Sequence, residues 1–297
     1  VIPKDQGLYE RRYEHDACGV GAVANVTGEQ SHGIIEYGRQ ILENLHHRGA
    51  AGSDEVTGDG AGILMQIPHE FFASTSGLDL GPANGYGVGM VFLPKDDKLR
   101  QACEKELAAA LKHYGLSLLG WRDVPVNRDC LGPLALSAEP AIRQLFAGAN
   151  GKTGEDLECA LFMARRRAHR LIREKYGDTA EDFYIVTLSS RTICYKGMFM
   201  AWQLFAYYPD LADERMKSAL AVVHQRYSTN TFPNWQLAQP FRNLAHNGEI
   251  NTLQGNVNKL AARESKMHSP RFGDDMTDLR PVIYPDQSDS ACFDNAL

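Results

Sequence analysis

Residues 15–21 read HDACGVG, and Cys18 in this stretch stands directly before a glycine. An alternation of small and apolar residues follows through Val20, Ala22 and Val23, which predicts a short strand over 19–26. A cysteine at the head of a strand is either a small buried side chain or a nucleophile. Its role depends on the residues that accompany it elsewhere in the chain.

Length and composition indicate a globular protein. The chain has 297 residues, of which 43% are hydrophobic, enough for a sizeable core. No apolar run approaches the roughly 18 to 20 residues that cross a bilayer, and residues 1–16 are too charged for a secretory signal. We therefore expect a cytoplasmic protein with no membrane segment. The chain starts with Val1 and stops inside an apparent helix start at 290–297, so we expect a fragment of a longer protein.

The charge pattern gives no sign of a nucleic-acid partner. The formal net charge is -6, which provides no general attraction to phosphate backbones. One basic run, RRRAHR at 165–170, opposes this trend within a helix predicted over 155–176. Because the apolar residues of that helix form a single stripe, we interpret the arginines as its solvent-exposed face.

The cysteines and histidines do not form a metal-binding or disulfide pattern. The six cysteines lie at positions 18, 103, 130, 159, 194 and 292, without a CxxC pair. The histidines at 46, 47, 224 and 246 are not spaced with a carboxylate as metal ligands, so no metal site is predicted. Cys103, Cys159 and Cys194 lie in apolar or amphipathic stretches and are interpreted as small hydrophobic residues.

Hydrophobic periodicity predicts an α+β protein with antiparallel sheets. Strands are predicted at 19–26, 63–68, 86–94, 117–127, 182–190, 191–197 and 219–229, and helices at 31–49, 97–114 and 155–176. The strands cluster instead of alternating strictly with helices, which favours layered antiparallel sheets over a doubly wound parallel one. The stretch 148–156, GANGKTGED, is the most linker-like loop, and we expect one domain with an insertion.

Two glycine-containing stretches allow a chemical or a purely structural interpretation. TGDGAG at 57–62 resembles a phosphate loop, but it lacks a following GKS or GKT and a helix start, so a tight turn is preferred. Asn247 and Gly248, in HNGE, are either a hairpin turn or an oxyanion hole. A predicted strand ending in the polar run 224–229 and a second short strand ending in HNGE would together form a pocket. A cysteine hydrolase that pairs Cys18 with His224 or His246 also stays open.

Several of these stretches together resemble the class II, N-terminal nucleophile, glutamine amidotransferases. CGVG at 18–21 and HRG at 47–49 are shared widely within that family. Three further stretches are similar to the amidotransferase domain of glutamate synthase large chains, namely TGDGAGILMQIP at 57–68, SSRTICYKGM at 189–198 and NTFPNW at 230–235. The similarity extends over nearly the whole chain.

This resemblance implies a four-layer αββα fold and a mature enzyme that begins at its cysteine. Residues 1–17 would be a propeptide, and 18–297 the amidotransferase domain. Cys18 would attack the side-chain amide of L-glutamine, with its own freed α-amino group as the base. Such a base does not exist while Ala17 is joined to Cys18.

The resemblance also assigns roles in the site. Asn247 and Gly248 match the oxyanion hole, Arg226 the group that pairs with the α-carboxylate of glutamine, and Asp289 the acceptor of its α-ammonium. Thr229 matches a weaker substrate hydrogen bond and Arg48 an organising residue beside the nucleophile. Without the resemblance, Arg226 and Asp289 would be interpreted as members of ordinary ion pairs.

The implied reaction converts glutamine and water to glutamate and ammonia through a γ-glutamyl thioester. The ammonia would go to synthase domains of the same chain, where 2-oxoglutarate is aminated. Those absent domains would carry FMN and an iron–sulfur cluster and would use a small subunit or ferredoxin as electron donor, whereas this segment is expected to hold no cofactor. The alternatives are an amidotransferase with another ammonia acceptor, namely a sugar phosphate, a phosphoribosyl compound or aspartate, and a catalytically silent module.

Overall fold

The computed structural model describes residues 7, 10, 19–52, 54–227, 232–285 and 287–297. Two of the predicted site residues, Cys18 and Thr229, lie outside these ranges. The predicted leader lies outside them as well, apart from Gly7 and Glu10.

Eight strands form two antiparallel sheets of four. The first sheet has the order β1 (Val20–Ala24), β8 (Leu220–Gln225), β2 (Ala61–Gln66) and β7 (Thr192–Gly197). The second has the order β4 (Ser117–Asp123), β5 (Ala141–Gly148), β3 (Tyr86–Leu93) and β6 (Tyr184–Ser189). All eight residues of β3 are buried, as expected for a central strand covered on both faces.

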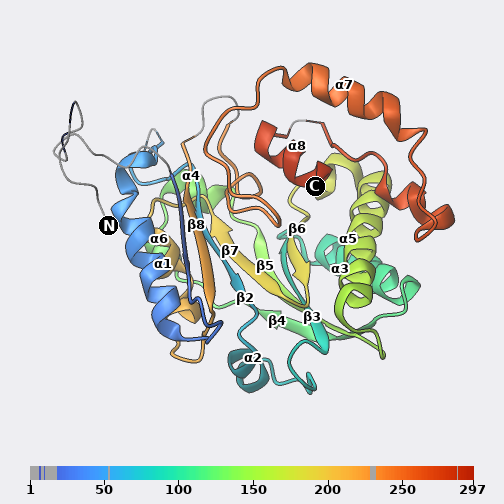
Figure 1. Ribbon diagram of the computed structural model, residues 1–297, viewed down its shortest axis with the longest axis horizontal. Helices are drawn as coiled ribbons and strands as arrows, with labels where there is room; N and C mark the ends of the chain where they lie inside the picture. Colours follow the sequence, from blue (N-terminus) through green and yellow to red (C-terminus); the bar gives the residue numbers. More distant parts are fainter. Residues whose placement is uncertain (1–6, 8–9, 11–18, 53, 228–231, 286) are drawn as a thin grey trace.

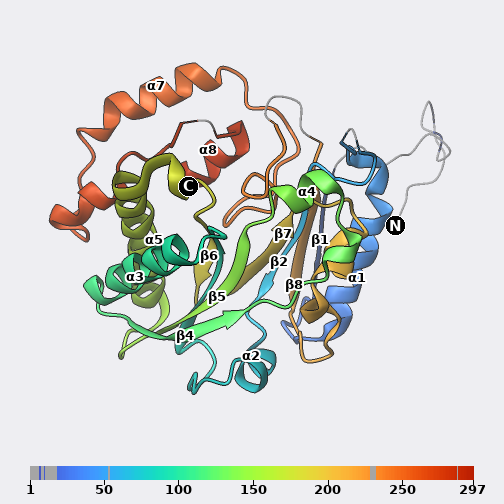
Figure 2. The ribbon, with the colours of Figure 1, turned by 180° about the vertical axis from the view of Figure 1, so that it is seen from behind.

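Helices cover the outer face of each sheet, so that the molecule has four layers. Helix α1 (His32–Asn44) packs on the first sheet, and α3 (Asp97–His113) and α5 (Gly154–Tyr176) cover the second (Figure 1). Figure 2 shows the same layers from behind, with α3 and α5 together on one side. The predicted α+β class with an αββα arrangement is therefore confirmed.

The shorter elements lie around these layers. The remaining α-helices are α2 (His69–Thr75), α4 (Pro133–Ser137), α6 (Gln203–Tyr207), α7 (Leu253–Glu264) and α8 (Asp289–Ala296). The 3-10 helices are η2 (His46–Arg48), η3 (Arg128–Cys130), η4 (Gly177–Ala180), η5 (Pro209–Ala212) and η6 (Gly273–Leu279). Helix α7 buries none of its residues and arches at the periphery, above α8 in Figure 1.

Close contact between α1 and the first sheet depends on glycines. A Cβ atom at Gly21 of β1 would lie 2.2 Å from Cγ2 of Ile41, and one at Gly38 would lie 3.2 Å from Cδ1 of Ile63. Side chains at these two positions would push the helix away from the sheet. The core between the two sheets then consists of large apolar side chains, including Phe92.

The burial of α5 corrects the interpretation of the basic run. Arg165 and Arg166 are only 6% and 3% exposed, so they do not lie on a solvent-exposed face. Arg166 Nη2 donates hydrogen bonds to the carbonyl oxygens of Leu279 (2.7 Å) and Pro281 (2.5 Å). The C-terminal segment thus covers this face of α5. The periodicity of the helix alone predicts that the same face is exposed to solvent.

Four further features of the local structure differ from the prediction or were not predicted. Strand β5 was not predicted, and the linker-like stretch 148–156 is a tight connection from β5 to α5 within the same layers. The helix predicted over 31–49 ends at Asn44 and continues only as η2. No second strand precedes HNGE, because the described residues 241–252 are irregular.

Two of the three cysteines interpreted as small hydrophobic residues are buried, whereas Cys159 is only partly buried. Cys103 and Cys194 are fully buried, and burial raises the pKa of their thiols to about 11 and about 12. Both thiols are therefore inert at neutral pH.

In the described part of the chain, no helix has the length and apolarity that crossing a membrane requires.

Candidate active site

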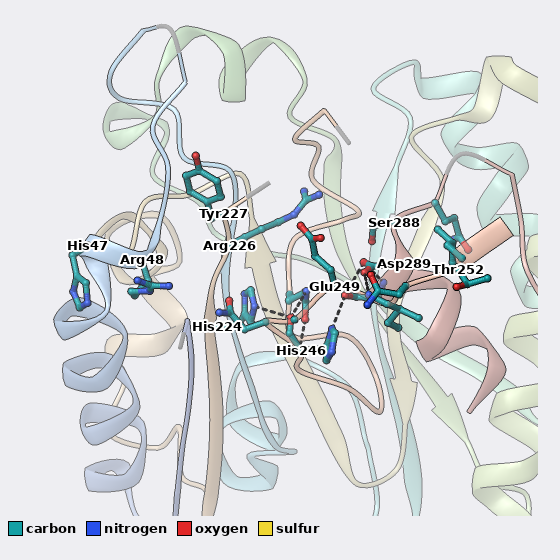
Figure 3. Close-up of a pocket in the computed structure, with 18 residues that line it drawn as sticks. His47, Arg48, His224, Arg226, Tyr227, His246, Glu249, Thr252, Ser288 and Asp289 are labelled. Carbon is teal, nitrogen blue, oxygen red and sulfur yellow. Dashed lines mark hydrogen bonds between the residues drawn. The ribbon is translucent and has the colours of Figure 1, made fainter. Parts of the chain in front are cut away.

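One cavity collects most of the predicted site residues. It has a volume of about 780 Å³ and lies where β8 ends, beside η2 and the start of α8 (Figure 3). Its lining comes from four separate segments, which are 47–48, 224–227 without Gln225, 246–253 and 287–290, together with Gln239. Arg48, Arg226, Asn247, Gly248 and Asp289 all belong to this lining, so the structure brings every described site candidate together.

Gly19 is the first described residue after Cys18, and it lies against the predicted oxyanion hole. Its carbonyl oxygen accepts a hydrogen bond from the N–H of Gln225 (2.7 Å). A Cβ atom at Gly19 would lie 2.4 Å from the carbonyl oxygen of Gln225 and 2.8 Å from Oδ1 of Asn247. Only glycine fits at this position. The Asn247 side chain therefore lies next to the backbone of the residue that follows Cys18 in the sequence.

The loop that carries Asn247 and Gly248 is held on both sides. The Gln239 side chain accepts from the N–H of His246 (2.8 Å) and donates to its carbonyl oxygen (3.0 Å). On the other side, Oδ2 of Asp289 accepts from the N–H of Ile250 (2.7 Å). These bonds fix an irregular segment without the support of a strand or helix.

His224 is a poor general base for the nucleophile. Its ring is 1% exposed, and its Nε2 donates to the carbonyl oxygen of His246 (3.2 Å). Burial is the main cause that lowers the pKa of His224 to about 3, and Arg226 lowers it further. A base this weak cannot hold the proton of a thiol near neutral pH, which argues against a Cys18–His224 pair.

Arg226 is a buried cation in the wall of the cavity. It is 5% exposed, and its backbone N–H donates to the carbonyl oxygen of Gly60 (2.8 Å). Burial lowers the pKa of its guanidinium, and the carboxylates of Asp59 and Asp289 act in the opposite direction. Figure 3 shows the side chain extending across the cavity toward Glu249. An anionic group in the cavity would stabilise this charge further.

Asp289 supplies the opposite charge from the first residue of α8. Ser288 caps this helix by accepting from the N–H of Ala291 (3.2 Å). The two oxygens of Asp289 accept from the N–H groups of Ile250 and Ser290, and each oxygen keeps lone pairs for a further donor. Arg226 and Asp289 thus give the cavity one cationic and one anionic group, as a zwitterionic ligand requires.

The remaining glycine motifs position the chain around the cavity. A Cβ atom at Gly49, in HRG, would lie 2.2 Å from Nε2 of Gln225, so this glycine admits the Gln225 side chain beside Arg48. In TGDGAG, a Cβ atom at Gly58 would lie 2.1 Å from the backbone of Phe199, and Gly60 has a φ of 150°. The glycines of this stretch thus have a structural role, but the stretch forms a bend at Asp59 that leads into β2 and not a tight turn.

Sequence reasoning missed part of the site. Gln239 gave no signal, because nothing in its local sequence distinguishes it from a surface glutamine. Ser290, whose Oγ lies 3.3 Å from Nδ1 of His246, was also missed. The HNGE motif predicts no role for Glu249, although Glu249 lines the cavity.

The four histidines considered for a metal site do not form one among the described residues. The one group of three ligand-type side chains found there is His113, Asp275 and Asp278, which lies outside the cavity. Asp278 in this group already pairs with Arg167 (2.8 Å) and Arg170 (2.6 Å), so it is a structural carboxylate.

Comparison with known proteins defines the family. The family of class II glutamine amidotransferases matches residues 18–297, a range that begins at Cys18. The chain therefore belongs to the class II glutamine amidotransferases, in agreement with the two-sheet fold and with the cavity described above.

The similar proteins are considerably longer. The chain is 46% identical over 300 residues to the glutamate synthase [NADPH] large chain of Bacillus subtilis (strain 168), covering 100% of this chain and 19% of that protein. It is 46% identical over 293 residues to the corresponding large chain of Azospirillum brasilense, covering 97% and 19%. It is 40% identical over 287 residues to ferredoxin-dependent glutamate synthase 2, chloroplastic, of Arabidopsis thaliana, covering 95% and 18%. The chain thus spans less than a fifth of the length of these relatives.

Proposed function

We propose that this chain is the glutaminase domain of a glutamate synthase, with Cys18 as the nucleophile. The observation that carries the proposal is the convergence of Arg226, Asp289 and Asn247 on one cavity, beside the glycine that follows Cys18. An amino acid with a side-chain amide matches these groups at both ends. The carboxylate and ammonium on its α-carbon match Arg226 and Asp289, and its amide lies at the end where Asn247 and the thiol of Cys18 are expected. The identity to glutamate synthase large chains supports the same assignment.

The first step needs a free amino group on Cys18. An α-amine has a reference pKa of about 7.7 to 8.0 and a cysteine thiol about 8.5, so a proton passes between them at little cost near neutral pH. A peptide nitrogen cannot accept this proton. Residues 1–17 are therefore proposed to be a propeptide that must be removed, and 18–297 to be the catalytic domain.

The thiolate then attacks the amide carbon of glutamine. As the S–C bond forms, negative charge moves to the amide oxygen, and the side-chain amide of Asn247 and the N–H of Gly248 are proposed to stabilise it. Collapse breaks the C–N bond, and the α-ammonium of Cys18 returns its proton to the leaving ammonia. A water molecule then hydrolyses the γ-glutamyl thioester to glutamate, which regenerates the thiol.

Arg226 and Asp289 are proposed to bind the α-carboxylate and the α-ammonium of glutamine. A guanidinium suits the first task because it offers two parallel donors to a carboxylate. Arg48 is proposed to organise the cavity beside the nucleophile. Thr229 is proposed to donate a further hydrogen bond to the substrate, although it lies outside the described residues.

The ammonia is proposed to reach a synthase site outside this chain, where 2-oxoglutarate is aminated. That site would hold FMN and an iron–sulfur cluster and would receive electrons through a small subunit or from ferredoxin. The names of the relatives include NADPH-, NADH- and ferredoxin-dependent enzymes, so they do not select one donor.

Glutamine hydrolysis by three forms of the protein tests this function. We expect activity from a chain that begins at Cys18, and essentially none from a chain that intact-mass measurement shows to begin at Val1. Cys18→Ala should be inactive, with an unchanged circular dichroism spectrum. Full activity of the chain that begins at Val1 would contradict the N-terminal nucleophile mechanism. Inactivity of all three forms would favour a silent module.

A further inference from the structure

A second cavity lies between α5, β6 and α8, on the side of the second sheet. It has a volume of about 400 Å³, and α5 and α8 lie side by side here in both views (Figures 1 and 2). Three arginines line it, namely Arg165 and Arg173 from α5 and Arg242 from the irregular segment between β8 and α7. These residues are distinct from the groups proposed to bind glutamine.

Arg165 is the most unusual of the three. It is 94% buried, and its guanidinium carbon lies 5.3 Å from the centre of the Phe162 ring. Among the described residues, no acceptor forms a hydrogen bond with it, and no carboxylate lies within ion-pair distance of it. Burial lowers the pKa of Arg165 strongly, and repulsion from Arg242 and Arg166 lowers it further. A buried guanidinium in this position is costly unless an anion joins it.

The neighbouring carboxylate does not meet this need. Asp294 is the acidic residue with the strongest effect on Arg165, but its Oδ2 lies 2.6 Å from Nη2 of Arg242. Arg242 also donates to Oδ1 of Asn295 (2.8 Å). Asp178 and Glu181 line the rim of the cavity and are exposed to solvent. Counted over the residues that the structure describes, its floor therefore carries more positive than negative charge.

His169 adds a neutral donor to the same cavity. Its Nε2 accepts a hydrogen bond from the N–H of Ile185 (3.2 Å), so the ring proton resides on Nδ1. Burial and the surrounding arginines lower the pKa of His169 well below its ordinary value, which keeps the ring uncharged at neutral pH. The cavity thus offers guanidinium and imidazole N–H donors and one exposed cation, Arg173, at its edge.

We propose that this second cavity binds a small oxyanion, a metabolite bearing a carboxylate or phosphate group, through Arg165. A guanidinium makes two parallel hydrogen bonds with either group, and a cavity of about 400 Å³ is large enough for a small metabolite. Helix α8 borders both cavities, since Asp289 lines the first and Ala291 and Asn295 line the second. The inference does not depend on the proposed glutaminase function.

Thermal unfolding of the 297-residue chain tests the site with two probes, inorganic phosphate and succinate. Sodium chloride at equal ionic strength is the reference. At a probe concentration about a hundredfold above Kd, we expect one of the two to raise Tm by roughly 5 °C over chloride. The probe that acts identifies phosphate or carboxylate as the ligand class. Calorimetric titration of the Arg226→Met chain with the same probe should give one site per chain, because this variant removes the cation of the first cavity.

Two buried arginines provide matched variants. Arg165→Met should lose the anion-dependent rise in Tm, whereas Arg226→Met should keep it, because Arg226 lines the first cavity. If Arg165→Met does not fold, Arg173→Gln at the exposed rim replaces it and should weaken binding several-fold. Absence of a rise over chloride in the unmodified chain would overturn the proposal. An equal rise in Arg165→Met, or a loss confined to Arg226→Met, would also overturn it.

Discussion

Gln239 forms two hydrogen bonds with the backbone of His246. Its Oε1 accepts from the N–H (2.8 Å) and its Nε2 donates to the carbonyl oxygen (3.0 Å). The next two residues are Asn247 and Gly248, the proposed oxyanion hole. A buried side chain that has no role of its own in the proposed reaction thus sets the position of the donors on which that reaction depends.

Replacement of Gln239 by methionine should therefore impair both stability and catalysis. The variant leaves the N–H of His246 unsatisfied, and we expect a loss of about 1–3 kcal/mol in the free energy of unfolding. The variant should also displace Asn247 and Gly248, whose N–H groups are proposed to bind the oxyanion. Because these bonds form in the transition state, kcat for glutamine should fall more than KM rises. Urea denaturation and steady-state kinetics measure both effects. Gln236→Met, which removes one bond to the Glu181 carbonyl oxygen at a half-buried position, is the control and should keep kcat.

Gly19→Ala should remove most of the activity while leaving the sheets folded. The new Cβ would meet the Gln225 carbonyl oxygen at 2.4 Å, and this backbone atom cannot move without shifting the end of β8. We expect a loss of roughly 100-fold or more in kcat/KM, because a small displacement at the nucleophile has a large effect on rate. Gly33→Ala in α1 is the control, since its Cβ would meet only Ser31 Oγ at 3.6 Å. Equal activity in the two variants would contradict the close packing of Gly19.

Asp289→Asn should weaken recognition of the substrate ammonium specifically. The amide oxygen can still accept from the N–H of Ile250, so the loop should stay in place. A lost charge-assisted bond corresponds to a decrease of about 10- to 100-fold in kcat/KM for glutamine. Hydrolysis of glutaramate, which lacks the α-amino group, should be nearly unchanged. A parallel loss with both substrates would indicate a structural role for Asp289 instead.

His224 should make stability depend on pH between about 7 and 5. Its pKa is about 3 in the folded protein and near 6.5 in the unfolded chain, so the unfolded state takes up a proton first as the pH falls. The contribution of His224 to the free energy of unfolding is therefore complete above about pH 6.5. Below that pH it decreases, by about 2 kcal/mol at pH 5. Urea denaturation at the two pH values should show a smaller decrease in His224→Gln. An identical decrease would exclude His224 as its source.

Asp278→Asn should destabilise the contact between α5 and the C-terminal segment. The carboxylate is fully buried and binds Arg167, Arg170 and the hydroxyl of Tyr114 (2.6 Å). Loss of one partner from a buried ion pair costs about 3–5 kcal/mol. The control Asp156→Asn breaks an exposed pair with Arg271 and should cost less than about 1 kcal/mol. Chemical denaturation of both variants gives the comparison.

Strand β5 was not predicted from the sequence, and its side-chain contacts explain why. Its sequence, AIRQLFAG, places Arg143 and Gln144 in the middle of an apolar run. Gln144 is buried because Arg122 and Tyr195 satisfy its side chain, and Arg143 pairs with Glu104. These partners belong to other elements, so the local pattern resembles a loop even though the strand is central to the second sheet.

The sequence by itself determined the elements whose signals are local. The apolar stripe of α5 and most strands of both sheets follow from the periodicity of neighbouring residues. The motifs of the sequence also pointed to Arg48, Arg226, Asn247, Gly248 and Asp289, which line one cavity, while their roles stay predictions. The tertiary structure decided the burial of Arg165, the clamp by Gln239 and the low pKa of His224. Each of these depends on desolvation and hydrogen-bond partners supplied by distant segments, and only the folded chain brings those segments together.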